Sequence, residues 1–350
     1  MKYPTGKLYP FICSALFLVL SSVVYAHVES TDGHTHVDEE ITESAQNLVK
    51  VYADRPYLNQ QLLFGFDHPK RTEVDFLPLA SHSDIGVTVG LMRNNHIEAT
   101  HGLLRETLSD TGYLRIQSIM SLEGVLRHSV PNQYTMGRLP DAYQIQFFGD
   151  PRQDEPYAIK YEGHHISLNI TVADDSVRGT PLFLGSNPAH VEVGTQRGFR
   201  ALAPQEDLAC ELLASLSKKQ SAVAVQTSDE YNIPRKEMNS IGAPRGLAAK
   251  DMTKGQQQLL LRLIQSYAKT MRAEIADEEM NRIESAGIEN IHFLWSNVND
   301  TGKRVYYRVQ GPTVLIEFQK VADNHIHSLW RDPHTDFGKD LLVEHLKEGH

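Results

Sequence analysis

Cysteine is nearly absent from this chain, whose 350 residues contain only Cys13 and Cys210. Because Cys13 lies in an N-terminal apolar stretch that we expect to be removed, the mature chain keeps Cys210 alone. One cysteine excludes an internal disulfide and an iron–sulfur cluster, and the missing C-x-x-C-H pattern excludes attached haem c. Cys210 lies between Leu208 and Leu212 in an amphipathic stretch, which favours a buried filler over a nucleophile.

Positive charge is also scarce, since 34 Lys and Arg residues stand against 44 Asp and Glu. No basic stripe is present, which argues against nucleic acid and anionic membranes as partners. The sequence lacks a G-x-S-x-G elbow, a Walker loop, the dinucleotide-binding glycine pattern and an H-E-x-x-H motif. We therefore expect no nucleotide cofactor.

Long apolar runs are missing except at the N-terminus. There, two lysines precede an apolar run from Phe11 to Val24, which ends in compact residues at Ala26. The run is short for a membrane-spanning helix, so we predict a secretory signal peptide over residues 1–26 and a mature chain that is periplasmic or secreted. An uncleaved anchor is the alternative. No membrane span is expected after cleavage.

The mature chain begins with a polar, acidic stretch without periodicity, residues 27–42, which predicts a flexible His-containing tail. A free His27, with His34 and His36, forms a pattern that can chelate copper, but the favoured interpretation is a mobile tail with incidental histidines. Removing residues 1–26 from the 350 leaves 324 residues. A chain of that length is longer than a domain with a single hydrophobic core usually is.

Two parts of the chain resemble each other. IGVTVGLMRNNHIEATHGLL (85–104) matches IGAPRGLAAKDMTKGQQQLL (241–260) without a gap, 156 positions further on, at isoleucine, glycine and leucine positions. In each copy a glycine-containing entry precedes a predicted helix. Thr253 and Gln256 form a capping-box pattern before the apolar stripe of the second helix.

A second match relates residues 143–170 to residues 291–318 at 148 positions, with Gly163 matched to Gly311. Each half then contains helices, an aromatic strand and a hairpin that turns at the glycine. We therefore predict an α+β fold of two diverged helical-plus-β-hairpin modules with pseudo-twofold symmetry. The modules cover 43–203 and 204–350; chance similarity between amphipathic stretches is the alternative.

Histidines and carboxylates concentrate towards the C-terminus. His325 and His327 are two positions apart, so a strand points both to one face. Glu317, in TVLIEF, lies on the face opposite its apolar neighbours, where an ionised group is costly unless it is paired or bound to a metal. Two imidazoles and a carboxylate are the donors of a facial metal triad.

Charged residues follow these histidines at Arg331, Asp332 and Asp336. A guanidinium beside such a site suits a carboxylate or phosphate group of a substrate. An ion pair between Arg331 and an aspartate that only holds the loop is the alternative.

A further histidine pair stands in GHHISLN (163–169). Alternation places His165, Ser167 and Asn169 on one face of a strand and His164 on the apolar face. If the modules pack about a pseudo-twofold axis, their polar faces meet.

His165 then becomes the third imidazole beside His325 and His327. Three imidazoles can hold zinc with an open position, or copper. The alternative is a set of hydrogen-bonded or solvated histidines without a metal.

Four segments together resemble the domain-of-unknown-function family numbered 3500: GHHISLN, PLFLGSNP (181–188), YYRVQGPTVLIE (306–317) and NHIHSLWRDPHTDFGKDLL (324–342). The resemblance covers nearly the whole mature chain and implies a single full-length family domain. It implies no reaction, because that family has no established activity. Its motif residues in this chain are His164, His165, His325, His327, Arg331, Asp332 and Asp336.

The sequence therefore favours an exported metal-dependent enzyme that acts on a small-molecule substrate. His165, His325 and His327 would hold zinc, copper or iron, and Glu317 would be a ligand or general base. Arg331 would anchor the substrate, and Asp332 is a further candidate catalytic residue. Hydrolysis by a metal-bound water needs the fewest assumptions, with oxidative chemistry close behind. A non-catalytic periplasmic carrier of a metal ion or small acid, and a purely structural exported protein, are the alternatives. The oligomeric state is not predicted.

Overall fold

The computed structural model describes residues 37–78, 86–129, 138–226, 233, 241–297, 305–322 and 324–348. The predicted signal peptide and residues 27–36 of the predicted tail, with His27, His34 and His36, lie outside these ranges. Residues 37–42 begin helix α1 (Val37–Val51), so for them the predicted tail is wrong. Val37, Ile41 and Ala45 recur every four residues and are buried, which makes this acidic stretch amphipathic. Within the described ranges, no helix is long and apolar enough to cross a membrane.

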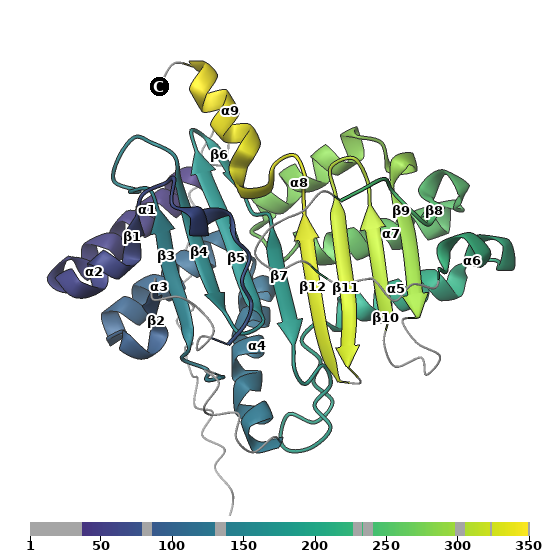
Figure 1. The fold of residues 1–350 in the computed structure, drawn as a ribbon, viewed down its shortest axis with the longest axis horizontal. Coiled ribbons are helices and arrows are strands. Elements are labelled where there is room, and N and C mark those ends of the chain that lie inside the picture. Colours follow the sequence, from purple (N-terminus) through teal and green to yellow (C-terminus); the bar gives the residue numbers. More distant parts are fainter. Residues whose placement is uncertain are drawn as a thin grey trace, which may run out of the picture. The chain divides into compact units, whose positions relative to one another are not determined.

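The described part of residues 36–350 forms one compact unit, and its α+β class agrees with the prediction. Twelve strands of the described residues join in one mixed sheet with the central order β1-β3-β4-β5-β7-β12-β11-β10-β9-β8, while β2 pairs with β3 and β6 with β5 (Figure 1). Their bounds are β1 (Leu63–Phe64), β2 (Val87–Thr88), β3 (Tyr143–Phe148), β4 (Tyr157–Gly163), β5 (Ile166–Ala173), β6 (Ser176–Arg178), β7 (Leu182–Ser186), β8 (Leu247–Ala248), β9 (His292–Asn297), β10 (Val305–Gln310), β11 (Leu315–Ala322) and β12 (His325–Arg331).

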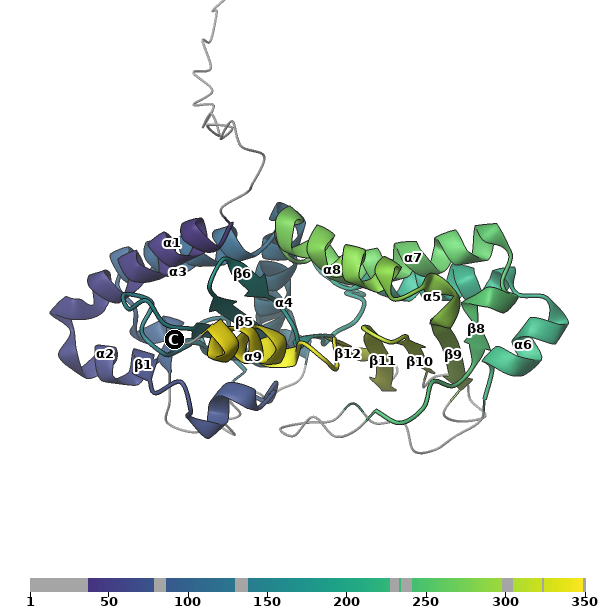
Figure 2. The ribbon, with the colours of Figure 1, turned by 90° about the horizontal axis from the view of Figure 1, so that it is seen from above.

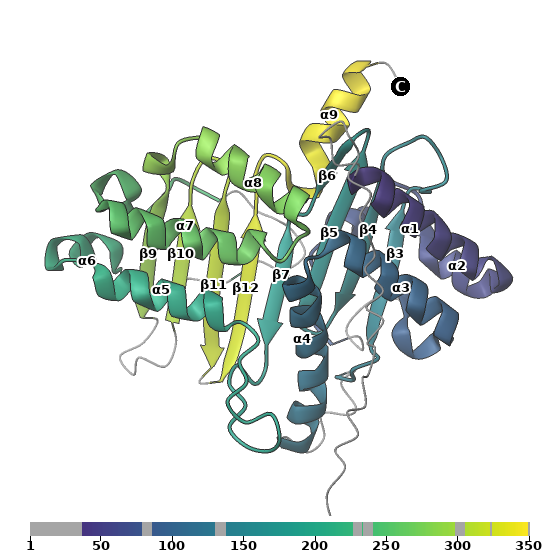
Figure 3. The ribbon, with the colours of Figure 1, turned by 180° about the vertical axis from the view of Figure 1, so that it is seen from behind.

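Helices cover one face of this sheet, as Figures 2 and 3 show. The main apolar core lies between them and the strands, because alternate strand residues point to the helices. Besides α1, the helices are α2 (Pro56–Leu62), α3 (Asn94–Thr107), α4 (Asp110–Ser129), α5 (Ala203–Ser215), α6 (Lys218–Ala224), α7 (Lys254–Ala268), α8 (Ala273–Ser285) and α9 (Lys339–Glu348).

The opposite face carries a second, smaller apolar cluster. In it, Phe76 stacks on Phe183 of β7 with ring centroids 3.8 Å apart. The rest of this face is rich in buried polar side chains. Lys160, for example, donates hydrogen bonds to the carbonyl oxygens of Lys70 and Glu73, so the sheet holds a crossing loop in place.

The predicted hairpins are confirmed. Strands β4 and β5 pair around the turn after Gly163, and β10 and β11 pair around the turn at Gly311. Their registers repeat at 148 positions: Lys160 lies opposite Asn169, and Arg308 lies opposite Glu317.

The match at 156 positions is wrong by four residues. The two glycines with positive φ that precede a short strand and a helix are Gly86, at 102°, and Gly246, at 96°. These two are 160 positions apart, whereas the match at 156 pairs Gly90 with Gly246. Identity alone misled the alignment, because several glycines stand close together in each stretch.

Strands β7 and β12 join the two halves of the sheet. They pair antiparallel, with Leu182 opposite Trp330 and Ser186 opposite Ile326. This pairing places the start of β12 beside the end of β7 and near the tip of the β4–β5 hairpin. Residues that are about 160 positions apart in the chain therefore meet there.

Candidate metal centre

His325 and His327 lie on β12 and point to the same face, as predicted. Their ring centroids are 4.7 Å apart. Alternation along a strand explains this geometry, since the intervening Ile326 is buried in the helix-side core.

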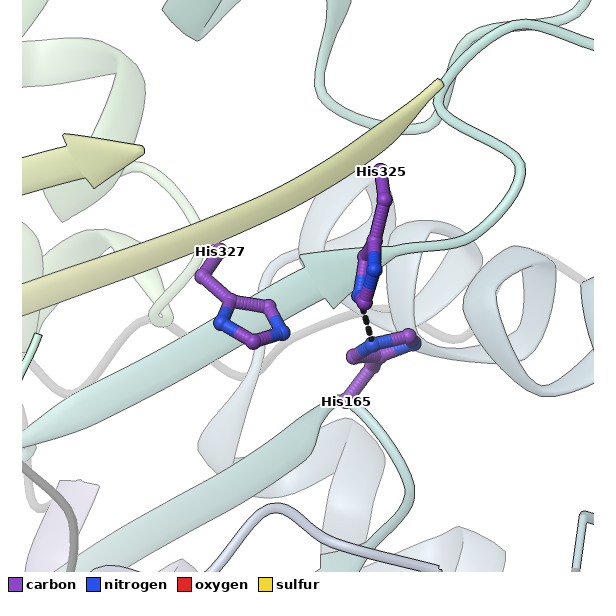
Figure 4. Close-up of side chains that lie close together, drawn as sticks. All are labelled: His165, His325 and His327. Atoms are coloured by element: carbon purple, nitrogen blue, oxygen red, sulfur yellow. Dashed lines mark hydrogen bonds between the residues drawn. The ribbon is translucent and has the colours of Figure 1, made fainter. Parts of the chain in front are cut away.

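His165 reaches them from the hairpin tip (Figure 4). Its Nε2 lies 2.8 Å from Nε2 of His325, and its ring centroid lies 5.4 Å from that of His327. One potential ligand atom of each ring lies within 4.8 Å of the others. The three predicted imidazoles therefore converge on one point.

The local backbone at His165 differs from the predicted strand. His165 stands in the turn between β4 and β5 with a φ of 68°, not at a strand position. Its N–H donates to the carbonyl oxygen of Phe76, and its carbonyl oxygen accepts from the N–H of Gly185. These two bonds hold the turn against β7 and aim the ring at β12.

Gly185 makes room for that ring. It lies directly opposite His327 on the neighbouring strand. A Cβ atom at this position would stand 2.7 Å from Cδ2 of His165, closer than real side chains approach. The absence of a side chain at Gly185 is thus what lets the ring of His165 cross the end of β7.

Burial keeps these imidazoles neutral. Burial, and after it the charges of neighbouring histidines, lower the pKa of His325 to about 4 and that of His327 to about 3. The pKa of His165 is also lowered well below its usual value, first by burial and then by the adjacent rings. Near neutral pH each ring therefore has a lone pair available for a metal ion.

An aromatic wall flanks His327. The rings of Phe76 and Phe183 meet it edge-on, at centroid distances of 5.0 and 5.4 Å. This wall makes one side of the centre apolar.

A second group of potential ligands adjoins the first and shares His165 with it. Glu123 of α4, His164 and His165 place one potential ligand atom each within 4.8 Å of one another. Oε1 of Glu123 contacts Nδ1 of His164, whose ring stacks on that of His165 at 3.7 Å.

Glu123 and Arg138 were not predicted as site residues. A signal for Glu123 exists in the sequence, because it continues the stripe of Ile116, Ile119 and Met120 on α4, where a carboxylate is unexpected. Arg138 follows a stretch outside the described residues and has no such signal. Its positive charge helps to lower the pKa of His325 and of His165.

Glu317 lies apart from both groups. It is buried on β11 opposite Leu329, and its Oε1 accepts a hydrogen bond of 2.6 Å from Tyr306. Burial raises its pKa, against the hydrogen bond from Tyr306 and the charges of Arg308 and Arg331. A buried carboxylate at this position needs a polar partner, and that partner is the hydroxyl of Tyr306 and not one of the histidines.

Arg331 and Asp332 stand at the other end of β12. Arg331 is six positions after His325, which on a strand is roughly 20 Å. Nε of Arg331 donates to Oδ2 of Asp336 at 2.7 Å, and both side chains are buried. Asp332 accepts from the N–H of His334 at 2.9 Å. The geometry thus matches the alternative of an ion pair that holds the loop.

Comparison with known proteins gave one family. A family model described as "Protein of unknown function (DUF3500)" matches residues 34–339. Neither a curated protein nor a solved structure matched the chain.

Proposed function

This chain belongs to the DUF3500 family, and because that membership assigns no reaction, we propose from its geometry that it is an exported metal-dependent enzyme. His165, His325 and His327 are the proposed ligands. The observation that carries the proposal is their convergence from two separate hairpins, 160 residues apart, with low pKa values. Histidines that cluster by chance would not need the left-handed backbone of His165 or the missing side chain at Gly185 to come together.

Hydrolysis is the proposed reaction. A divalent ion held by three imidazoles, zinc above all, supplies a Lewis acid that activates water near neutral pH while one position stays open for it. The protein's own part is to hold three neutral donors rigidly and to exclude bulk water with the Phe76 and Phe183 rings. Oxidative chemistry at copper or iron would use the same donors.

The proposed substrate carries an anionic group. Arg138 lies close enough to His165 and His325 to influence their pKa values, and its buried Nε has no hydrogen-bond partner among the residues that the structure describes. A guanidinium so placed suits a carboxylate or phosphate. Arg138 therefore takes the anchoring role predicted for Arg331, whose guanidinium is bound to Asp336.

The alternative function is a non-catalytic periplasmic carrier of a metal ion or small acid. The same imidazoles and the same guanidinium would serve it. Tight binding without turnover in a substrate screen would favour the carrier over the enzyme.

We also propose that the chain arose by duplication, with a pseudo-twofold axis between β7 and β12. The shared register at 148 positions supports this, and so does the pair Leu182 and Trp330, which are 148 positions apart and lie opposite each other. Export is supported by the N-terminal sequence alone.

The test of the enzyme proposal removes and restores the metal. Chelator-treated protein should lose hydrolysis of activated carboxylate and phosphate esters and regain it with zinc, copper or iron. His325→Ala should not regain it, whereas His190→Ala, at an exposed position next to β12, should behave like the parent. Activity that survives both chelation and His325→Ala would contradict the proposal.

A further inference from the structure

The group formed by Glu123, His164 and His165 contains two donors, Glu123 and His164, that the three-histidine centre does not use. All three side chains are buried, with exposed fractions of 2%, 4% and 2%. One carboxylate and two imidazoles are donors that zinc and other divalent ions accept.

The carboxylate of Glu123 is only half satisfied. Its Oε1 contacts His164, but its buried Oε2 has no hydrogen-bond partner among the described residues. A carboxylate that merely orients a ligating histidine accounts for Oε1 and leaves Oε2 unexplained. A buried anionic oxygen without a partner is costly, and a cation next to it removes that cost.

His165 stands between the two groups. Its Nε2 faces His325, so the three-histidine centre uses that nitrogen. Nδ1 of the same ring is left as a further donor, and one ligand atom of His165 lies within 4.8 Å of those of Glu123 and His164. A ring that binds ions through both nitrogens does so as imidazolate, and its remaining ring proton passes to solvent.

We propose that Glu123, His164 and Nδ1 of His165 hold a second divalent cation beside the one held by His165, His325 and His327. The centre is then dinuclear, with His165 as the shared ligand. This inference rests on the proposed three-histidine centre and extends it by one ion.

The experiment counts ions. Full-length protein is stripped with a chelator, loaded with excess Zn²⁺, desalted and analysed for zinc per chain. We expect two equivalents in the parent, one in Glu123→Gln and two in Asp110→Asn, an exposed carboxylate on the same helix. His164→Gln should also bind one, which provides a second variant if Glu123→Gln does not fold.

Loading with Co²⁺ gives a readout that needs no variant. Two ions that share an imidazolate should give a spin-coupled electron paramagnetic resonance signal in the parent, replaced by an isolated high-spin signal in Glu123→Gln. One zinc per parent chain, or two in Glu123→Gln, would overturn the second position. One equivalent that persists in Glu123→Gln but is lost in His327→Ala leaves the three-histidine centre standing, whereas no bound zinc at all removes both.

Discussion

At the scale of single residues, the candidate centre depends on a position that has no side chain. Gly185→Ala would put a Cβ atom 2.7 Å from the ring of His165, so the ring must move away from His325 and His327. We expect zinc affinity to fall by at least tenfold, about 1.4 kcal/mol, although no ligand has changed. Competition with a chromophoric chelator would measure this. Unchanged affinity would mean that the ring's position over β7 is not required.

The two arginines should behave in opposite ways. Arg331→Met leaves the buried Asp336 without its ion-pair partner, which should lower the free energy of unfolding by roughly 3–5 kcal/mol. Zinc binding should be unaffected, because the pair lies at the far end of β12. Arg138→Met should hardly change stability but should weaken binding of inorganic phosphate to the zinc-loaded protein. Urea denaturation and calorimetric titration of both variants test this contrast.

Glu279 on α8 predicts a pH dependence. Burial raises its pKa from 4.5 to about 7, although Arg282 is its ion-pair partner. Because the folded-state pKa lies above the unfolded one, the stabilising contribution is complete below pH 4.5 and is lost as the pH rises to about 7. The loss is on the order of 3 kcal/mol for a shift of this size.

Glu279→Gln should remove that part of the pH dependence. Unfolding in urea at pH 5 and pH 8 would measure it, with Glu284→Gln, an exposed position on the same helix, as the control. If the free energy of unfolding changes equally between pH 5 and pH 8 in Glu279→Gln and in the parent, Glu279 is ionised throughout that range.

At the scale of elements, helix α7 begins with the capping box that the sequence pattern predicted. The hydroxyl of Thr253 accepts from the N–H of Gln256, whose side chain accepts in return from the N–H of Thr253. Thr253→Ala should therefore cost about 0.5–2 kcal/mol, measurable by thermal unfolding, while Lys254→Ala on the exposed side should change little. A loss as large in Lys254→Ala would mean that the cap is not the cause.

Regular elements and their facing could be predicted because they depend on local spacing. Strand alternation was enough to orient His325 and His327, and it also identified Glu317 as a buried polar position. The partner of Glu317 could not be predicted, because the hydroxyl of Tyr306 comes from a neighbouring strand whose register is not local information. The same limit applies to Arg331, where local sequence allowed both a substrate anchor and an ion pair.

The turn at His165 could not be predicted from the alternation of side chains along a strand. A strand continued through GHHISLN gives the wrong backbone for His165, because its left-handed φ depends on the hydrogen bonds to Phe76 and Gly185. Glu123 was missed because a carboxylate within an apolar helix stripe can be recognised as a site residue only when His164 is known to lie next to it.

At the scale of the whole described unit, the candidate centre is a product of sheet order. The pairing of β7 with β12 joins two sets of hairpins and brings the tip of one to the first residues of the other. Neither half of the chain has all three imidazoles. A metal ion bound there would therefore link the two halves. The unfolding temperature of the protein should rise as the concentration of that metal ion rises.

The most direct measurement is a crystal structure of the zinc-loaded protein with diffraction recorded on both sides of the zinc absorption edge. We predict an anomalous peak at a bonding distance of about 2.0–2.1 Å from a ring nitrogen of each of His165, His325 and His327. Loaded crystals without a peak among these three rings, or with zinc bound only elsewhere, would contradict the account.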